Sequence, residues 1–147
     1  MRYRRRIRFP WRLLFLVLLG AAVWAALAWP RINDVATGTT REYPDIQNRE
    51  YTAAPDHVFG AAQAAAAGLR YWSVIGTGSG PGGSSLQAVH CRRPLPIREE
   101  ISVKISRRKG MTVVTVRSRS TWLKWDFGQN ARNIRAFLKR LDEEMFL

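Results

Sequence analysis

The chain has 147 residues, a formal net charge of +13 and one cysteine. This length allows one small domain with its own hydrophobic core, and a single cysteine excludes an intrachain disulfide. Six of the 24 basic residues precede residue 13, which leaves 18 basic and 11 acidic side chains beyond residue 29.

The first predicted element is an apolar helix over residues 13–29, LLFLVLLGAAVWAALAW. It contains no charged side chain, and at about 1.5 Å per residue it rises about 26 Å, close to a hydrocarbon core of roughly 30 Å. Arg12 before it can extend its charge to the membrane surface, and Trp11 and Trp29 stand where interfacial aromatic residues are found. We therefore expect one transmembrane helix that follows a basic cytoplasmic segment over residues 1–12.

The arginines before this helix predict its orientation, because basic residues stay on the cytoplasmic side of membrane helices. We expect a single-pass protein of the bacterial inner (cell) membrane, with a cytoplasmic N-terminus and a periplasmic C-terminal domain. This topology makes the lipid bilayer the expected partner and excludes nucleic acid. A cleaved secretory signal is the alternative, because Ala26-Leu27-Ala28 has the form of a cleavage site. The apolar stretch is at the long limit for such a signal, which favours the uncleaved anchor.

Residues 30–55 have no clear hydrophobic period and predict an extended lead-in, so the α+β exported domain is expected over 56–147. The first helix of this domain is predicted from Asp56 to Leu69, because apolar residues recur at steps of three and four. Two strands follow, Tyr71–Ile75 and Leu86–Cys91. The glycine-rich stretch 76–85 between them predicts a flexible connection. It lacks the Gly-Lys-Ser/Thr of a phosphate-binding loop.

A second turn is expected over Arg92–Pro96, and strict alternation then predicts a hairpin. Its strands contain Ile101–Ser106 and Val113–Arg119. A two-residue turn at Lys109-Gly110 or a four-residue loop keeps both apolar sets on one face. With the shorter turn Lys104 faces Thr115, Ser102 faces Arg117, and Glu100 faces Arg119 as a candidate ion pair.

The last predicted helix runs from about Gly128 to Glu144, with Asp126 as its N-terminal cap. Its inward residues are expected to be Ala131, Ile134, Phe137, Leu138, Leu141 and Met145. The expected fold class is therefore α+β, an antiparallel sheet of about four strands covered by two helices and preceded by one transmembrane helix.

Several motifs in order resemble the bacterial family of domains of unknown function numbered 1499. They are Asn33–Thr37, Tyr43-Pro44, Arg117–Ser120, Asp126–Ala131 and Ile134–Leu138. The chain departs from the family pattern at Thr121, Leu123 and Asn133. The resemblance implies a small exported α+β domain and no established activity.

The polar residues around the predicted start of the last helix form the candidate binding site. They are Arg117, Ser118, Arg119, Ser120, Asp126 and Asn130. One interpretation is structural: Asp126 caps the helix, Asn130 binds a neighbouring carbonyl, the serines bond at the strand ends and Arg117 satisfies the loop. The other is an anion site in which arginines and helix-start N–H groups hold a phosphate or carboxylate. Asp126 argues against it, because its carboxylate occupies the same donors.

Three large apolar residues, Trp122, Leu123 and Trp125, surround a lysine in the same loop. They either cover one end of the core or form a contact patch for the membrane interface or a partner subunit.

Catalysis has little support in the sequence. His90 and Cys91 are adjacent on a predicted strand, so their side chains face opposite ways. No His, Cys, Asp or Glu cluster has metal-ligand spacing, and we expect neither metal nor cofactor.

The expected function is a noncatalytic, membrane-anchored binding or assembly module of the cell envelope. It acts as an accessory subunit of an inner-membrane complex, with a membrane-protein partner, through the tryptophan loop and a basic sheet face that includes Lys104. The alternative is an envelope enzyme or an anionic-ligand or lipid-binding protein that uses the region of Arg117 and Asp126.

Overall fold

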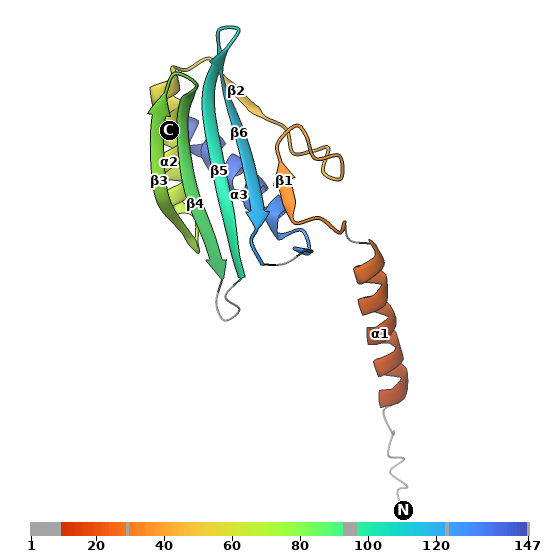
Figure 1. Cartoon of the computed structure of the whole chain (residues 1–147). Coiled ribbons are helices and arrows are strands. Elements are labelled where there is room, and N and C mark those ends of the chain that lie inside the picture. The colour runs from red at the N-terminus through yellow and green to blue at the C-terminus, as the bar shows by residue number, and fades with distance from the viewer. Residues whose placement is uncertain (1–9, 29, 93–96, 123, 147) are drawn as a thin grey trace, which may run out of the picture.

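The computed structural model describes residues 10–28, 30–92, 97–122 and 124–146. It shows an antiparallel sheet with two helices on one face and a third helix that projects away from the domain (Figure 1). This confirms the α+β class and the antiparallel sheet with two covering helices.

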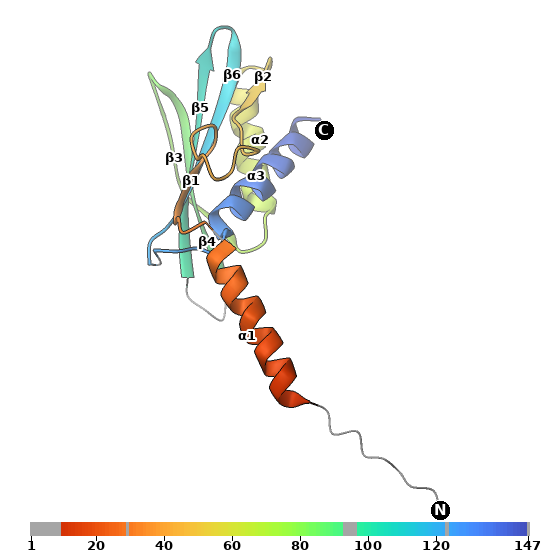
Figure 2. The same cartoon turned by 90° about the vertical axis from the view of Figure 1, so that its right-hand side faces the viewer.

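The projecting helix, α1, spans Trp11–Ala28. It begins two residues earlier than predicted and includes Arg12, while Trp29 and residues 1–9 lie outside the described residues. None of the helices in the described ranges combines the length and the apolarity that crossing a bilayer requires. The prediction of a transmembrane helix is therefore not supported. Figure 2 shows that α1 also points away from the domain in the second view.

The sheet has six strands in the described part of the chain, where about four were predicted. Their bounds are β1 Asp34–Ala36, β2 Arg49–Tyr51, β3 Trp72–Gly80, β4 Gly83–Arg92, β5 Ile97–Arg108 and β6 Met111–Ser120. The order is β1-β6-β5-β4-β3, and β2 also pairs with β6. The predicted lead-in supplies β1 and β2, and with three residues each they are too short to show an alternating pattern. They pair with backbone groups of β6 that would otherwise form an open sheet edge.

The glycine-rich stretch 76–85 was wrongly predicted as a flexible connection. It continues β3 and β4 to a tight turn at Pro81-Gly82, and Gly76–Ser79 pair with Ser84–Gln87. Gly83 has φ +108°, and a Cβ on it would lie 2.0 Å from the Ile105 carbonyl oxygen. The absence of side chains here lets the hairpin approach β5 closely, which alternation in the sequence cannot reveal.

The hairpin of β5 and β6 has the register predicted for the shorter turn. Lys104 pairs with Thr115, Ser102 with Arg117, and Glu100 with Arg119. Lys109 and Gly110 have φ of 48° and 84°, the left-handed pair that a two-residue hairpin turn needs. The expected Glu100–Arg119 ion pair is not formed, since no such contact occurs among the described residues. The pKa of Asp34 on β1 is lowered mainly by a hydrogen bond from Arg117, and the charge of Arg119 lowers it further.

Helices α2 (Pro55–Gly68) and α3 (Gln129–Met145) cover the inner face of the sheet and pack against each other. The small buried residues of α2 let this helix lie close to the sheet. Phe137 of α3 stacks on Trp72 of β3 with ring centroids 5.7 Å apart. The apolar residues predicted at steps of three and four on the first helix of the domain, and the predicted inward residues of the last helix, belong to one buried core or pack against it, which confirms both sets. Those of the first helix of the domain are Val58, Phe59, Ala62, Ala65, Ala66 and Leu69. Residues 93–96 of the predicted second turn lie outside the described residues.

Candidate functional site

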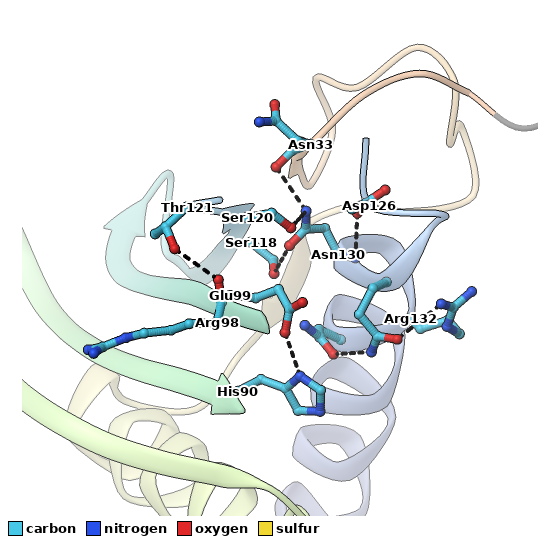
Figure 3. A network of polar contacts seen from close by, with 12 residues as sticks. Asn33, His90, Arg98, Glu99, Ser118, Ser120, Thr121, Asp126, Asn130 and Arg132 are labelled. Atoms are coloured by element: carbon cyan, nitrogen blue, oxygen red, sulfur yellow. Dashed lines mark hydrogen bonds and ion pairs between the residues drawn. The ribbon is translucent and has the colours of Figure 1, made fainter. Parts of the chain in front are cut away.

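A row of polar side chains crosses the inner face of the sheet at the end where β4 and β6 terminate (Figure 3). His90 is paired in register with Glu99, and Glu99 with Ser120, so three neighbouring strands contribute to the row. Their exposed fractions are 6%, 2% and 3%. The N-terminal turn of α3 covers this row, and the polar cluster formed by both is the candidate site.

Asn130, on the first turn of α3, joins the helix to β6 and to the residue just before β1. Its amide oxygen accepts a hydrogen bond from Ser118 Oγ at 2.7 Å. Its amide nitrogen donates to the Asn33 carbonyl oxygen at 2.8 Å and to Ser120 Oγ at 3.1 Å (Figure 3). The predicted structural roles of Asn130 and of both serines agree with these bonds. The fully buried amide therefore satisfies three groups, two on β6 and one in the segment that leads into β1.

Asp126 binds the start of α3 through both carboxylate oxygens. It accepts hydrogen bonds from the backbone N–H of Gly128 at 2.8 Å and from that of Asn130 at 2.7 Å. The cap residue itself is Gly128, whose φ of 74° needs the left-handed region. Asp126 thus lies two residues before the cap, yet it occupies the N–H groups that an anion would need.

The pair of His90 and Glu99 was missed in the sequence. His90 Nδ1 lies 2.6 Å from Glu99 Oε2, and both side chains are buried (Figure 3). Extending the alternation of β5 back from Ile101 places Glu99 on the buried face, which was the available signal. The predicted opposite orientation of His90 and Cys91 is confirmed, because His90 is buried and Cys91 is exposed. The short contact gives each buried group a partner.

Arg117 and Arg119 lie on the other face of the sheet from Ser118 and Ser120, as strand alternation requires. Arg117 does not satisfy the loop as predicted. Its guanidinium forms a two-point ion pair with Asp34, with Nε 2.8 Å from Oδ1. This hydrogen bond is the main cause that lowers the pKa of Asp34. The structure therefore brings four of the six predicted site residues together and separates the two arginines from them.

The loop after β6 presents aromatic side chains unevenly. Trp122 is 84% exposed, whereas Trp125 stacks on Phe127 with centroids 4.4 Å apart. Arg31 lies over the Trp125 ring at 5.8 Å. Leu123, the third residue of the predicted contact patch, lies outside the described residues. Of the two tryptophans, Trp125 is half-buried and in contact with neighbouring side chains, and Trp122 is the more exposed.

Comparison of the sequence with known families identifies the family of this chain. Residues 26–141 match the family described as a protein of unknown function, DUF1499. The chain belongs to the DUF1499 family. No curated protein matches this DUF1499 chain significantly. A crystal structure of protein CV1439 from Chromobacterium violaceum is similar at 11% identity and a TM-score of 0.39, over 74% of this chain and 94% of that one.

The chemistry that this DUF1499 site can perform follows from its partners. Each side chain of the cluster described above has a hydrogen-bond partner within the protein. No group of metal-ligating side chains occurs in the described ranges. The arrangement is that of a buried polar network that fastens α3 and β1 to the end of the sheet.

Proposed function

We propose that this protein is a noncatalytic binding or assembly module of the cell envelope, attached to the bacterial inner membrane through α1. The N-terminus is cytoplasmic, the domain is periplasmic, and the module acts as an accessory subunit beside a membrane-protein partner. The observation that carries this proposal is the exposed apolar surface of α1.

The side chains of α1 are exposed around the whole helix. Consecutive residues Phe15, Leu16, Val17 and Leu18 expose between 60% and 64% of their surface. Four consecutive residues point in all directions around a helix, so no single face is polar. Helices that are apolar on all sides occur inside proteins or in membranes. Because α1 projects from the domain (Figures 1 and 2), lipid or a partner helix is the surface expected to cover it.

The tryptophan loop, the segment after β6 that contains Trp122 and Trp125, supports contact with a membrane or a partner at the end of the domain where α1 is attached. In both views the segment after β6 lies at the end of the domain from which α1 projects. Trp122 and Phe127, exposed by 84% and 52%, belong to this segment. Aromatic side chains of this kind are enriched at membrane interfaces and at protein interfaces.

The alternative at Arg117 and Asp126 has no comparable support. Arg117 is paired with Asp34 on the outer face of the sheet. The Asp126 carboxylate binds N–H groups at the start of α3, which covers the inner face. A ligand bound to both would have to break an ion pair and a helix cap. We therefore keep the binding role with α1 and the tryptophan loop.

Charged substitutions in α1 test membrane attachment. In the full chain, Leu16→Lys with Leu19→Lys should move the protein from the alkali-washed membrane pellet to the supernatant, because each buried lysine disfavours insertion by about 2.5–3.5 kcal/mol. The matched control is Ala64→Lys with Ala67→Lys, two exposed positions on α2.

The control should stay in the pellet with the wild-type chain. If the α1 variant also stays in the pellet, or if the wild-type chain is washed off the membrane, the proposed attachment through α1 is wrong.

A further inference from the structure

A basic groove lies where the β3–β4 turn, the end of β5 and the start of α2 meet. It has a volume of about 580 Å³. Lys104, Arg107 and Arg108 line it, and Asp56 is the one carboxylate among its described lining residues. These elements meet at the end of the domain opposite α1 (Figures 1 and 2). The groove is therefore separate from both the polar cluster and the tryptophan loop.

The cations of this groove are not neutralised by the protein. Among the described residues, Lys104, Arg107 and Arg108 form no ion pair, and their side chains donate no hydrogen bond to another residue. Carboxylates do neutralise arginines elsewhere, namely Arg49, Arg117, Arg135 and Arg140. Strand alternation places Lys104 and Arg108 on the outer face and Arg107 on the inner face, so the three cations border the groove from both sides of the sheet end. A bound anion would offset this uncompensated positive charge.

The β3–β4 hairpin contributes uncharged hydroxyl groups to the groove, and its glycines leave space there. Ser79 Oγ and Ser84 Oγ, 3.4 Å apart, lie on the two strands that flank the turn and line the groove. Gly82 has no side chain to fill the groove, and a Cβ built on it would lie 3.9 Å from Lys104 Nζ. The ammonium group therefore lies over a turn where backbone is accessible.

We propose that this groove binds a phosphate-bearing ligand, held by Lys104, Arg107 and Arg108 and by the serine hydroxyls of the β3–β4 hairpin. A phosphate group carries up to two charges and several acceptor oxygens, so it can use more than one cation and the hydroxyl donors together. The volume is within the range of small-ligand sites. A soluble phosphate ester and a phospholipid headgroup share this chemistry. The inference does not depend on the proposed function.

The test uses the full chain in nanodiscs of neutral phosphatidylcholine. The groove variant carries Lys104→Gln, Arg107→Gln and Arg108→Gln. The matched control carries Arg41→Gln, Arg98→Gln and Lys139→Gln, three exposed cations outside the groove with the same change in net charge. In the first arm inorganic phosphate is titrated while amide chemical shifts are followed. A second arm adds phosphatidylglycerol vesicles in a buffer that contains no inorganic phosphate.

We expect phosphate to shift the amides around Lys104 and Gly82 and the groove variant to bind at least about tenfold more weakly, because charge-assisted hydrogen bonds are lost. The control should change affinity by less than about twofold, since exposed charges far from a site contribute little. Shifts of these amides with the vesicles alone, abolished in the groove variant, identify a lipid headgroup as the source. No shift in either arm, or equal weakening in both variants, overturns the proposal.

Discussion

Asn130 shows how one buried amide can hold three segments of the chain. Replacing it with alanine leaves Ser118 Oγ, Ser120 Oγ and the Asn33 carbonyl oxygen without the bonds described above. We expect Asn130→Ala to lower the free energy of unfolding by about 2–4 kcal/mol, because buried polar groups lose their partners.

Urea unfolding of the full chain in detergent measures this loss. The control Gln63→Ala removes an exposed amide from α2 and should change stability by less than about 0.5 kcal/mol. Similar losses in both variants would show that the Asn130 network does not stabilise the fold.

Asp34 predicts a dependence of stability on pH. Its pKa is lowered by the hydrogen bond from Arg117, so the folded state favours the ionised carboxylate more than the unfolded state does. The stability from this pair is complete above the unfolded pKa of about 3.9 and is lost as pH falls through the lower folded pKa. The pair is partly exposed, so we expect it to contribute less than about 1 kcal/mol.

The measurement compares the wild-type chain with Asp34→Asn at pH 7 and pH 3. Acidification should destabilise the wild-type chain more than the variant, which has no carboxylate to protonate at this position. An equal loss in both proteins would contradict the assigned role of Arg117.

At the scale of elements, Gly83 decides whether the β3–β4 hairpin can lie against β5. Gly83→Ala should destabilise the chain by about 2–4 kcal/mol, because φ is positive and the new Cβ would collide with the Ile105 carbonyl. Gly80 is the matched control in the same hairpin, since a Cβ there meets nothing within 4 Å. Thermal unfolding of both variants separates the predictions: if Gly80→Ala costs as much as Gly83→Ala, close approach to β5 is not the reason.

The elements also show what the sequence can predict. The register of β5 and β6 was predictable because long alternation and the Lys109-Gly110 turn agree. β1 and β2 were not, because their three residues each acquire strand structure only by pairing with β6. The extension of β3 and β4 through glycines was missed because glycine carries no side-chain pattern.

The candidate site was also predictable only in part. Ser118, Ser120, Asp126 and Asn130 lie together because a strand end and a helix start meet there, as the sequence order implied. Arg117 was misassigned because its partner, Asp34, belongs to a strand that alternation could not detect. The His90–Glu99 pair depends on the register between β4 and β5, which alternation within each single strand does not fix.

At the scale of the whole molecule, the domain has two opposite ends with different surfaces. One end contains the polar cluster and the tryptophan loop, beside the C-terminal end of α1 (Figures 1 and 2). The other end contains the basic groove, lined by Lys104, Arg107 and Arg108. In the proposed orientation the first end faces the membrane, and the groove faces away from it.

The orientation of the chain is tested most directly by an alkaline phosphatase fused after Leu147, because this enzyme is active only after export to an oxidising compartment. The account predicts an active fusion in intact bacterial cells, recovered with the membrane fraction. An inactive phosphatase, together with a fluorescent cytoplasmic reporter fused at the same position, would contradict the proposal of an exported domain tethered by α1.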